Sequence, residues 1–149
     1  MSPSTGETDL DRLLSGLRPD LLPDPYAFCS TTPDHATILW PTALGLFREV
    51  EGVTVILTAR AAAEAGLAHD GTWACITLTV HSALTAVGMI AALSARLAQA
   101  GLSLNPVAGY FHDHLFVPWA QRDLALEVLA SFGRPGDPTY VAGSGGSGQ

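Results

Sequence analysis

The clearest hydrophobic pattern lies in the second half of the chain. Residues 73–80 mix β-branched and apolar side chains and predict a central strand. We expect a helix to begin at His81-Ser82, with Ser82 as its N-cap, and to run to about Ala100. Five apolar residues recur at helical spacing within it: Leu84, Val87, Ile90, Leu93 and Leu97.

Two further segments extend this pattern. Residues 102–110 and 114–118 predict a β-hairpin with a tight turn at 111–113. Residues 121–132 carry inward-facing apolar positions and predict a last helix. Residues 73–132 are therefore expected to form one β-α-β-β-α module that binds a small ligand rather than performing chemistry.

The first half is patterned less regularly. Its expected elements are a helix over residues 8–17, a strand over 26–32, a loop carrying Trp40 over 33–45, a hairpin over 46–49 and 53–58, and a short helix over 59–65. The two halves then share a plan of strand, connection, hairpin and helix. We expect an N-terminal half at 1–72 with its leading helix, a C-terminal half at 73–134, and a flexible Gly/Ser tail at 135–149.

Composition and charge limit the function. Hydrophobic residues make up 48% of the chain and charged residues 14%, a balance that predicts a globular domain rather than a disordered one. Seven arginines, no lysines and fourteen carboxylates give a net charge of −7. Without a basic cluster, neither nucleic acid nor an anionic membrane surface is an expected partner.

The cysteines and the hydropathy pattern indicate the cellular compartment of the protein. The N-terminus lacks the features of a secretory signal, and every apolar stretch is interrupted before the length that spans a bilayer. Cys29 and Cys75 each lie in a strand-like run and are expected to be buried thiols. These features predict a cytoplasmic protein.

One candidate site lies where the central strand meets the following helix, at residues 79–84. A helix start offers free N–H groups and a partial positive charge of about half an elementary unit, which together can hold a carboxylate. Val87 and Gly88 would then leave room for a ligand one turn further on. The alternative is that Ser82 only caps the helix and His81 only caps or packs.

A second candidate is the segment His112-Asp113-His114. Two histidines around an aspartate can ligate a metal, with His81 or His69 as a third ligand, and would suit a small metal-dependent enzyme. The alternative is that Asp113 is an ordinary turn residue. The sequence contains neither a Gly-x-Ser-x-Gly nucleophile motif nor a Gly-rich phosphate loop, so no cofactor is expected.

Several of these segments resemble a known family. Residues 76–88, ITLTVHSALTAVG, are similar to the strand–loop–helix of ACT domains, and residues 101–118, GLSLNPVAGYFHDHLFVP, continue the likeness. Residues 5–10 and 47–54 fit the same small bacterial proteins with two ACT-like halves. Ligand-binding members often carry a glycine in the first loop, whereas His81, Ser82 and Ala83 supply none.

The resemblance implies an α+β fold of tandem ferredoxin-like βαββαβ halves, with antiparallel sheets and helices packed on one face. It implies binding of an amino acid or similar small carboxylate, pairing of ACT domains in a homodimer or within one chain, and regulation of a separate enzyme. Carried onto this sequence, the ligand-binding residues would be His81, Ser82, Ala83, Leu84 and Val87, faced by Asn105, Pro106 and Val107.

Three hypotheses therefore remain. The leading one is a non-catalytic regulatory module that binds an amino acid. The others are a metal-dependent enzyme that uses His112, His114 and His81, and an oligomerisation module without a ligand.

Overall fold

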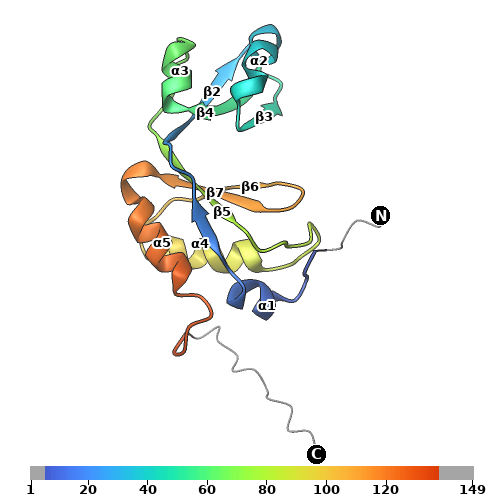
Figure 1. Cartoon of the computed structure of the whole chain (residues 1–149), viewed down its shortest axis with the longest axis vertical. Coiled ribbons are helices and arrows are strands. Elements are labelled where there is room, and N and C mark those ends of the chain that lie inside the picture. Colours follow the sequence, from blue (N-terminus) through green and yellow to red (C-terminus); the bar gives the residue numbers. More distant parts are fainter. Residues whose placement is uncertain (1–5, 138–149) are drawn as a thin grey trace, which may run out of the picture.

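A computed structural model describes residues 6–137 of the chain, which fold into a mixed α/β structure built on one curled antiparallel sheet (Figure 1). Seven strands form the sheet, and their main path runs β3-β4-β2-β5-β7-β6, with β1 pairing beside β5. None of the helices in these residues is long and apolar enough to cross a membrane.

The first half contributes three strands and two helices: β2 (Tyr26–Thr31), α2 (Pro33–Leu39), β3 (Gly45–Arg48), β4 (Val53–Thr58) and α3 (Ala59–Glu64). The predicted strand, hairpin and short helix are confirmed. The prediction of a loop across residues 33–45 is wrong, because α2 occupies its beginning and a 3₁₀ turn, η1 (Trp40–Thr42), follows. The local signal was present: the Thr32 hydroxyl accepts the N–H of His35, and Pro33 suits the first helical position.

The second half contributes β5 (Trp73–Leu78), α4 (Met89–Gln99), β6 (Asn105–Ala108), β7 (Asp113–Pro118), the 3₁₀ turn η2 (Trp119–Gln121) and α5 (Arg122–Ala130). The central strand, the hairpin and the last helix are confirmed. The predicted start of the long helix at His81-Ser82 is wrong, since residues 79–88 form a loop and α4 begins only at Met89. Gly88 precedes it with φ 95°, a conformation that favours glycine and separates the loop from the helix.

Strand β5 belongs to both halves. At its beginning Trp73 pairs with Tyr26 of β2, which makes β5 the fourth strand of the first half. The rest of β5 pairs with β7 on one side and with β1 (Pro19–Leu21) on the other, so β5 is also the first strand of the second half. The first half thus has the ferredoxin-like βαββαβ order along the chain, and the second half completes the same arrangement with β1 from the start of the chain. This confirms the predicted fold class.

The leading helix, α1 (Leu10–Ser15), packs on the second half although it precedes the first. Leu13 and Leu14 are buried in the same core as Leu93 and Leu97 of α4 and Leu129 of α5. The division at residue 72 remains a prediction, and packing crosses it through α1 and β1. Of the predicted tail, residues 138–149 lie outside the described residues.

The two faces of the sheet are filled differently. One face carries separate apolar cores, one beneath α2 and α3 and the other beneath α1, α4 and α5. The other face carries a shared aromatic cluster, in which Phe28 meets Phe116 edge-on with ring centroids 5.0 Å apart. Within it Tyr26 also meets Phe116 edge-on, and Trp73 meets Phe28 edge-on. The aromatic cluster therefore joins the halves.

The two cysteines are free and buried, as predicted. Cys29 lies in the core beneath α2 and α3, and Cys75 lies in the aromatic cluster. Burial raises the pKa of the Cys75 thiol to about 11, so the group stays protonated and unreactive near neutral pH.

Replacing Phe116 by alanine should lower the free energy of unfolding by about 3–5 kcal/mol, because the ring is 1% exposed and its removal leaves a cavity between the halves. Phe111→Ala, at a ring that is 59% exposed, should change it by only about 0.5 kcal/mol. Urea unfolding measures both variants. Equal losses would mean that the aromatic cluster does not hold the halves together.

Candidate functional site

A cavity of about 200 Å³ lies between the loop at residues 79–88, the first turn of α4 and the β6–β7 hairpin. Its lining residues are Ser82, Ala83, Leu84, Ala86, Gly88, Met89, Ile90, Ala91, Ala108 and Asp113. Backbone from the loop and helix and a carboxylate from the hairpin therefore meet around one space.

Ser82 and Asp113 form the polar centre of this cavity. The Ser82 hydroxyl donates a hydrogen bond of 2.7 Å to Oδ2 of Asp113, although the residues are 31 positions apart. Ser82 is 8% exposed and is the one buried polar residue in the described part of the chain. The bond satisfies its hydroxyl and fixes the carboxylate, whose other oxygen, Oδ1, remains available to accept from a ligand.

The first turn of α4 supplies backbone donors to the same cavity. The first bond of the helix runs from the N–H of Ala92 to the carbonyl of Gly88, so the N–H groups of residues 89–91 have no carbonyl partner within the helix. All three residues line the cavity, and no side chain caps this helix end. The positive end of an 11-residue helix therefore faces the space beside Asp113.

The loop is held from outside by the N-terminal segment. The N–H of Glu7 donates to the carbonyl of His81, and the N–H of Ala83 donates to the carbonyl of Glu7, each at 2.9 Å. Gly6 lies against the same backbone, and a Cβ there would fall 2.5 Å from the Ala83 nitrogen. These contacts join two segments that are far apart in the sequence, and no local sequence pattern predicts them.

Glu7 also organises the start of α1. Its carboxylate accepts the N–H groups of Thr8 and Asp9, at 2.8 and 2.9 Å. These bonds, first that from Asp9, lower the pKa of the Glu7 carboxyl below its usual value. One residue therefore ties loop 79–88 through its backbone and α1 through its side chain.

Only part of the predicted ligand site meets in this cavity. Ser82, Ala83 and Leu84 line it, whereas His81 instead places its ring 5.6 Å from that of Phe111. Val87 is 82% exposed and lies outside the lining. The predicted facing residues Asn105, Pro106 and Val107 are exposed on the outer strand β6 and do not line the cavity either.

The sequence did not predict that Ala108 and Asp113 line the cavity. It also did not predict that the helix begins at residues 88–91. A signal for the helix start existed, because Gly88 immediately precedes a strongly helix-forming run. The loop also contains the glycine that residues 81–83 lack. It lies at the loop's end, where its positive φ is needed.

The side chains of His112, Asp113 and His114 do not converge on one site. Nδ1 of His112 lies 3.5 Å from the carbonyl of Val80, and Nδ1 of His114 is hydrogen-bonded to the Thr77 hydroxyl at 3.0 Å. Within residues 6–137, no three His, Cys, Asp or Glu side chains come together in a group that could hold a metal ion.

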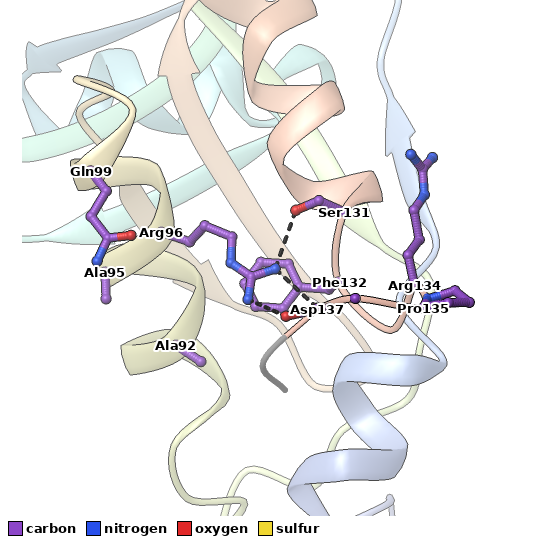
Figure 2. A pocket seen from close by; sticks show the side chains of 10 residues that line it. Ala92, Ala95, Arg96, Gln99, Ser131, Phe132, Arg134, Pro135 and Asp137 are labelled. Atoms are coloured by element: carbon purple, nitrogen blue, oxygen red, sulfur yellow. Dashed lines mark hydrogen bonds and ion pairs between the residues drawn. The ribbon is translucent and has the colours of Figure 1, made fainter. Parts of the chain in front are cut away.

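A larger cavity of about 670 Å³ lies between α4 and the residues that follow α5 (Figure 2). There the Arg96 guanidinium lies 3.7 Å from the ring centre of Phe132 and holds both carboxylate oxygens of Asp137, at 2.6 and 3.1 Å. Its charge is already neutralised within the chain, and the Asp137 side chain is only 2% exposed. This ion pair ties residues 133–137 to α4, and the smaller cavity remains the better candidate for a ligand.

Comparison with known protein families gives two matches. A model described as ACT domain matches residues 5–74, and a second model with the same description matches residues 70–131. The two matches overlap at the beginning of β5, the strand that both halves share. No curated protein matches the chain.

Three solved structures are similar. A Vibrio cholerae protein described as of unknown function and a possible transport protein is 39% identical, with a TM-score of 0.75 over 84% of this chain and 96% of that one. An Agrobacterium tumefaciens protein is 18% identical, with a TM-score of 0.63 over 76% and 87%. The regulatory subunit of aspartate kinase from Thermus thermophilus, in its ligand-free form, is 10% identical, with a TM-score of 0.54 over 78% and 97%. The last two show the fold alone.

Stability should fall as His114 is protonated. Burial lowers the pKa of His114 below 6.5, His112 lowers it further, and Asp113 partly opposes both. The unfolded chain therefore takes up this proton at a higher pH than the native protein, so the stabilisation is complete above about pH 6.5 and is lost as the pH falls. His114→Gln should lose less unfolding free energy than the wild type between about pH 7.5 and about pH 5.5.

Proton NMR of the imidazole measures the same effect directly. The His114 ring protons should titrate with a midpoint below 6.5 in the native protein. A midpoint at or above that value would contradict the burial argument.

Proposed function

The chain belongs to the ACT-domain family, and we propose on that premise that it is a regulatory module that binds an amino acid or a similar small carboxylate. ACT domains are typically regulatory and non-catalytic. The proposal places the ligand in the cavity between loop 79–88, the first turn of α4 and the β6–β7 hairpin. The expected position of the ligand carboxylate thereby shifts from the backbone at Ser82 to the start of α4.

The observation that carries the proposal is the opposite polarity of the two cavity walls. The three N–H groups at the start of α4 favour an anion, and the Asp113 carboxylate on the facing hairpin favours a cation. A zwitterionic amino acid carries both charges, on two groups attached to the same carbon atom. We expect its carboxylate at residues 89–91 and its ammonium group at Asp113.

The size of the cavity narrows the ligand class. About 200 Å³ is less than the usual 300–1,000 Å³ of drug-sized sites and suits a small amino acid. Most of the other lining side chains are apolar. Three of them are the short side chains of Ala83, Ala86 and Ala108, and two are the larger ones of Leu84 and Ile90. A short aliphatic side chain therefore fits this lining better than a charged one.

A bound ligand would act through the loop. Residues 79–88 contain no helix or strand, and hydrogen bonds to Glu7, Asp113 and Arg18 hold them to the rest of the chain. A ligand that bridges α4 and Asp113 would stabilise one arrangement of this loop and its exposed Leu84 and Val87. We propose that a separate enzyme binds this surface. The similar Thermus thermophilus protein is likewise described as a regulatory subunit.

Thermal unfolding in the presence of each common amino acid tests the proposal. A ligand that binds only the native protein at about 100 times its Kd adds about 2.7 kcal/mol, which raises the Tm by several degrees in a domain of this size. We expect at least one small amino acid to do so. No shift with any amino acid, or a shift with divalent metals alone, would rule the proposal out.

Two controls locate the ligand. Asp113→Asn keeps the shape of the side chain but removes its charge, and it should weaken binding at least about tenfold, because a charged hydrogen bond contributes about 1.5–3 kcal/mol. Asp70→Asn, at an exposed residue outside the cavity, should leave the Kd unchanged. The carboxylic acid without the amino group should bind the wild type as weakly as the amino acid binds Asp113→Asn.

A further inference from the structure

Residues 6–9 form a short segment that leads into α1, and we call this segment the N-terminal strap. In Figure 1 it runs beside the loop that joins β5 to α4, residues 79–88. Glu7 and Ser82 form an isolated parallel bridge there. Ser82 and the next residue, Ala83, also line the proposed ligand cavity. The strap therefore pairs with a loop that forms part of the cavity wall.

The loop is restrained near its beginning and at its end by this part of the chain. Near the beginning, the N–H of Glu7 donates to the carbonyl of His81, and the N–H of Ala83 donates to the carbonyl of Glu7. At the end, the side chain of Leu10, the residue that follows the strap, lies over Gly88, where a Cβ would fall 3.2 Å from its Cδ2. The residues between these two contacts include much of the cavity lining.

The strap has no other hydrogen bonds to the body of the protein. Its remaining ones are local, from the N–H groups of Thr8 and Asp9 to the Glu7 carboxylate and from the first turn of α1 to Asp9. Within residues 6–137, the two backbone bonds of Glu7 to the loop are its complete polar attachment. Two net hydrogen bonds favour the closed strap over an open one by a factor of about 5–150.

Helix α1 is anchored independently of the strap. Leu13 and Leu14 are buried in the core that also contains α4 and α5, whereas no residue of the strap belongs to that core. Asp9 has an extended backbone, with φ −72° and ψ 118°, and marks the point where the strap can turn away from the helix. Opening the strap therefore breaks two hydrogen bonds and leaves the core intact.

The closed strap fits tightly at Gly6. A Cβ at this residue would lie 2.5 Å from the nitrogen of Ala83 and 2.6 Å from the carbonyl carbon of Ser82. Gly6 has no positive φ, so its backbone conformation would admit alanine, and only the contact with the loop excludes the methyl group. Gly6→Ala is therefore a means of opening the strap without changing any residue that lines the cavity.

We propose that the strap is a closing element of the ligand site, which opens and closes over residues 79–88 and thereby controls the cavity beside them. Its pairing fixes the backbone on both sides of Ser82, whose hydroxyl holds Asp113 at 2.7 Å. The strap and the ligand stabilise the same arrangement of the loop. Each therefore strengthens the binding of the other by the same factor. The nature of the ligand rests on the proposed function, whereas the motion of the strap does not.

The opening equilibrium of the strap sets the affinity of the site. Because the open loop leaves Asp113 without its fixed orientation, the ligand binds the closed form, and the apparent Kd is the intrinsic Kd divided by the closed fraction. The wild type is mostly closed and shows nearly its full affinity. A variant that cannot close loses affinity by a factor of up to about 5–150. The same factor governs hydrogen exchange at the amides that the strap protects.

Hydrogen exchange of the wild type without any ligand measures the opening. The amide of Ala83 should be protected by a factor of about 5–150, and low concentrations of urea should not change it, because a local opening exposes little surface. The amide of Leu97, in the middle of the buried stripe of α4, should exchange only through global unfolding. Equal protection of the two amides would overturn the proposal, since the strap would then open only when the whole protein unfolds.

Gly6→Ala should lower the protection of the Ala83 amide at least about fivefold and leave that of Leu97 unchanged. Gly45→Ala is the matched control, because a Cβ there would lie at an ordinary 3.5 Å from Ile56 and far from the strap in the fold, and it should change neither amide. Unchanged protection of Ala83 in Gly6→Ala would overturn the proposal. An equal loss at Leu97 would overturn it too, because the contact would then support the whole fold rather than the loop.

Calorimetric titration with L-alanine and L-valine separates the strap from the proposed function. If either binds the wild type, Gly6→Ala should raise its Kd by the factor by which Ala83 loses protection, and the bound amino acid should increase the protection of Ala83 in the wild type. An unchanged Kd in Gly6→Ala would overturn the proposal. A wild type that binds neither would count against the proposed function, and the exchange of Ala83 would then decide on the strap alone.

Discussion

The structure depends above all on the sharing of strand β5 between the two halves of the sheet. Its first residue, Trp73, lies between β2 and β7, and further along Ile76 and Thr77 lie between β1 and β7. Every inward-facing side chain of this strand is therefore buried, and Ala74, Cys75, Ile76 and Leu78 are each fully inaccessible. The first half takes β5 from beyond residue 72, and the second half takes β1 from the start of the chain, so each half completes its strands with one from the other's sequence.

This sharing also explains how the candidate site is assembled. Strand β1 must return to β5, and that brings the residues before it against the loop that leaves β5. Glu7 then holds the backbone of His81 and Ala83. The loop's conformation is set by the N-terminal segment, by Asp113 on the hairpin and by Gly88 at the start of α4. Three segments distant in sequence thus position one small cavity.

The proposed binding site lies in the second half, but its sheet continues into the first half. Ligand contacts would order residues 79–88 directly after β5, and β5 pairs with β2, which pairs with β4 and through it with the outer strand β3. The aromatic cluster of Phe28 and Phe116 packs across the same junction. A change in the loop therefore has a continuous path of packed residues into the first half.

Local patterns in the sequence determined most of the elements and the fold class. The alternation in residues 53–58 and 114–118, the apolar run at 73–80 and the helical spacing at 122–130 each reflect burial of one face or both, which periodicity records directly. Helix α2 was missed although Thr32-Pro33 marked its start, because few of its residues are apolar and only Ala36 is buried. The start of α4 was misplaced because Ser82 has the side chain of an N-cap.

Only the tertiary structure decided what Ser82 does. Its hydroxyl bonds to Asp113, 31 residues away, and that bond exists only because β5 and β7 are neighbours in the sheet. The same holds for the Glu7 contacts and for the placement of Asn105 outside the cavity. Sequence periodicity reports which face of an element is buried, but it carries no information on which distant backbone or side chain lies against that face. The candidate ligand cavity of this protein is built from such distant contacts.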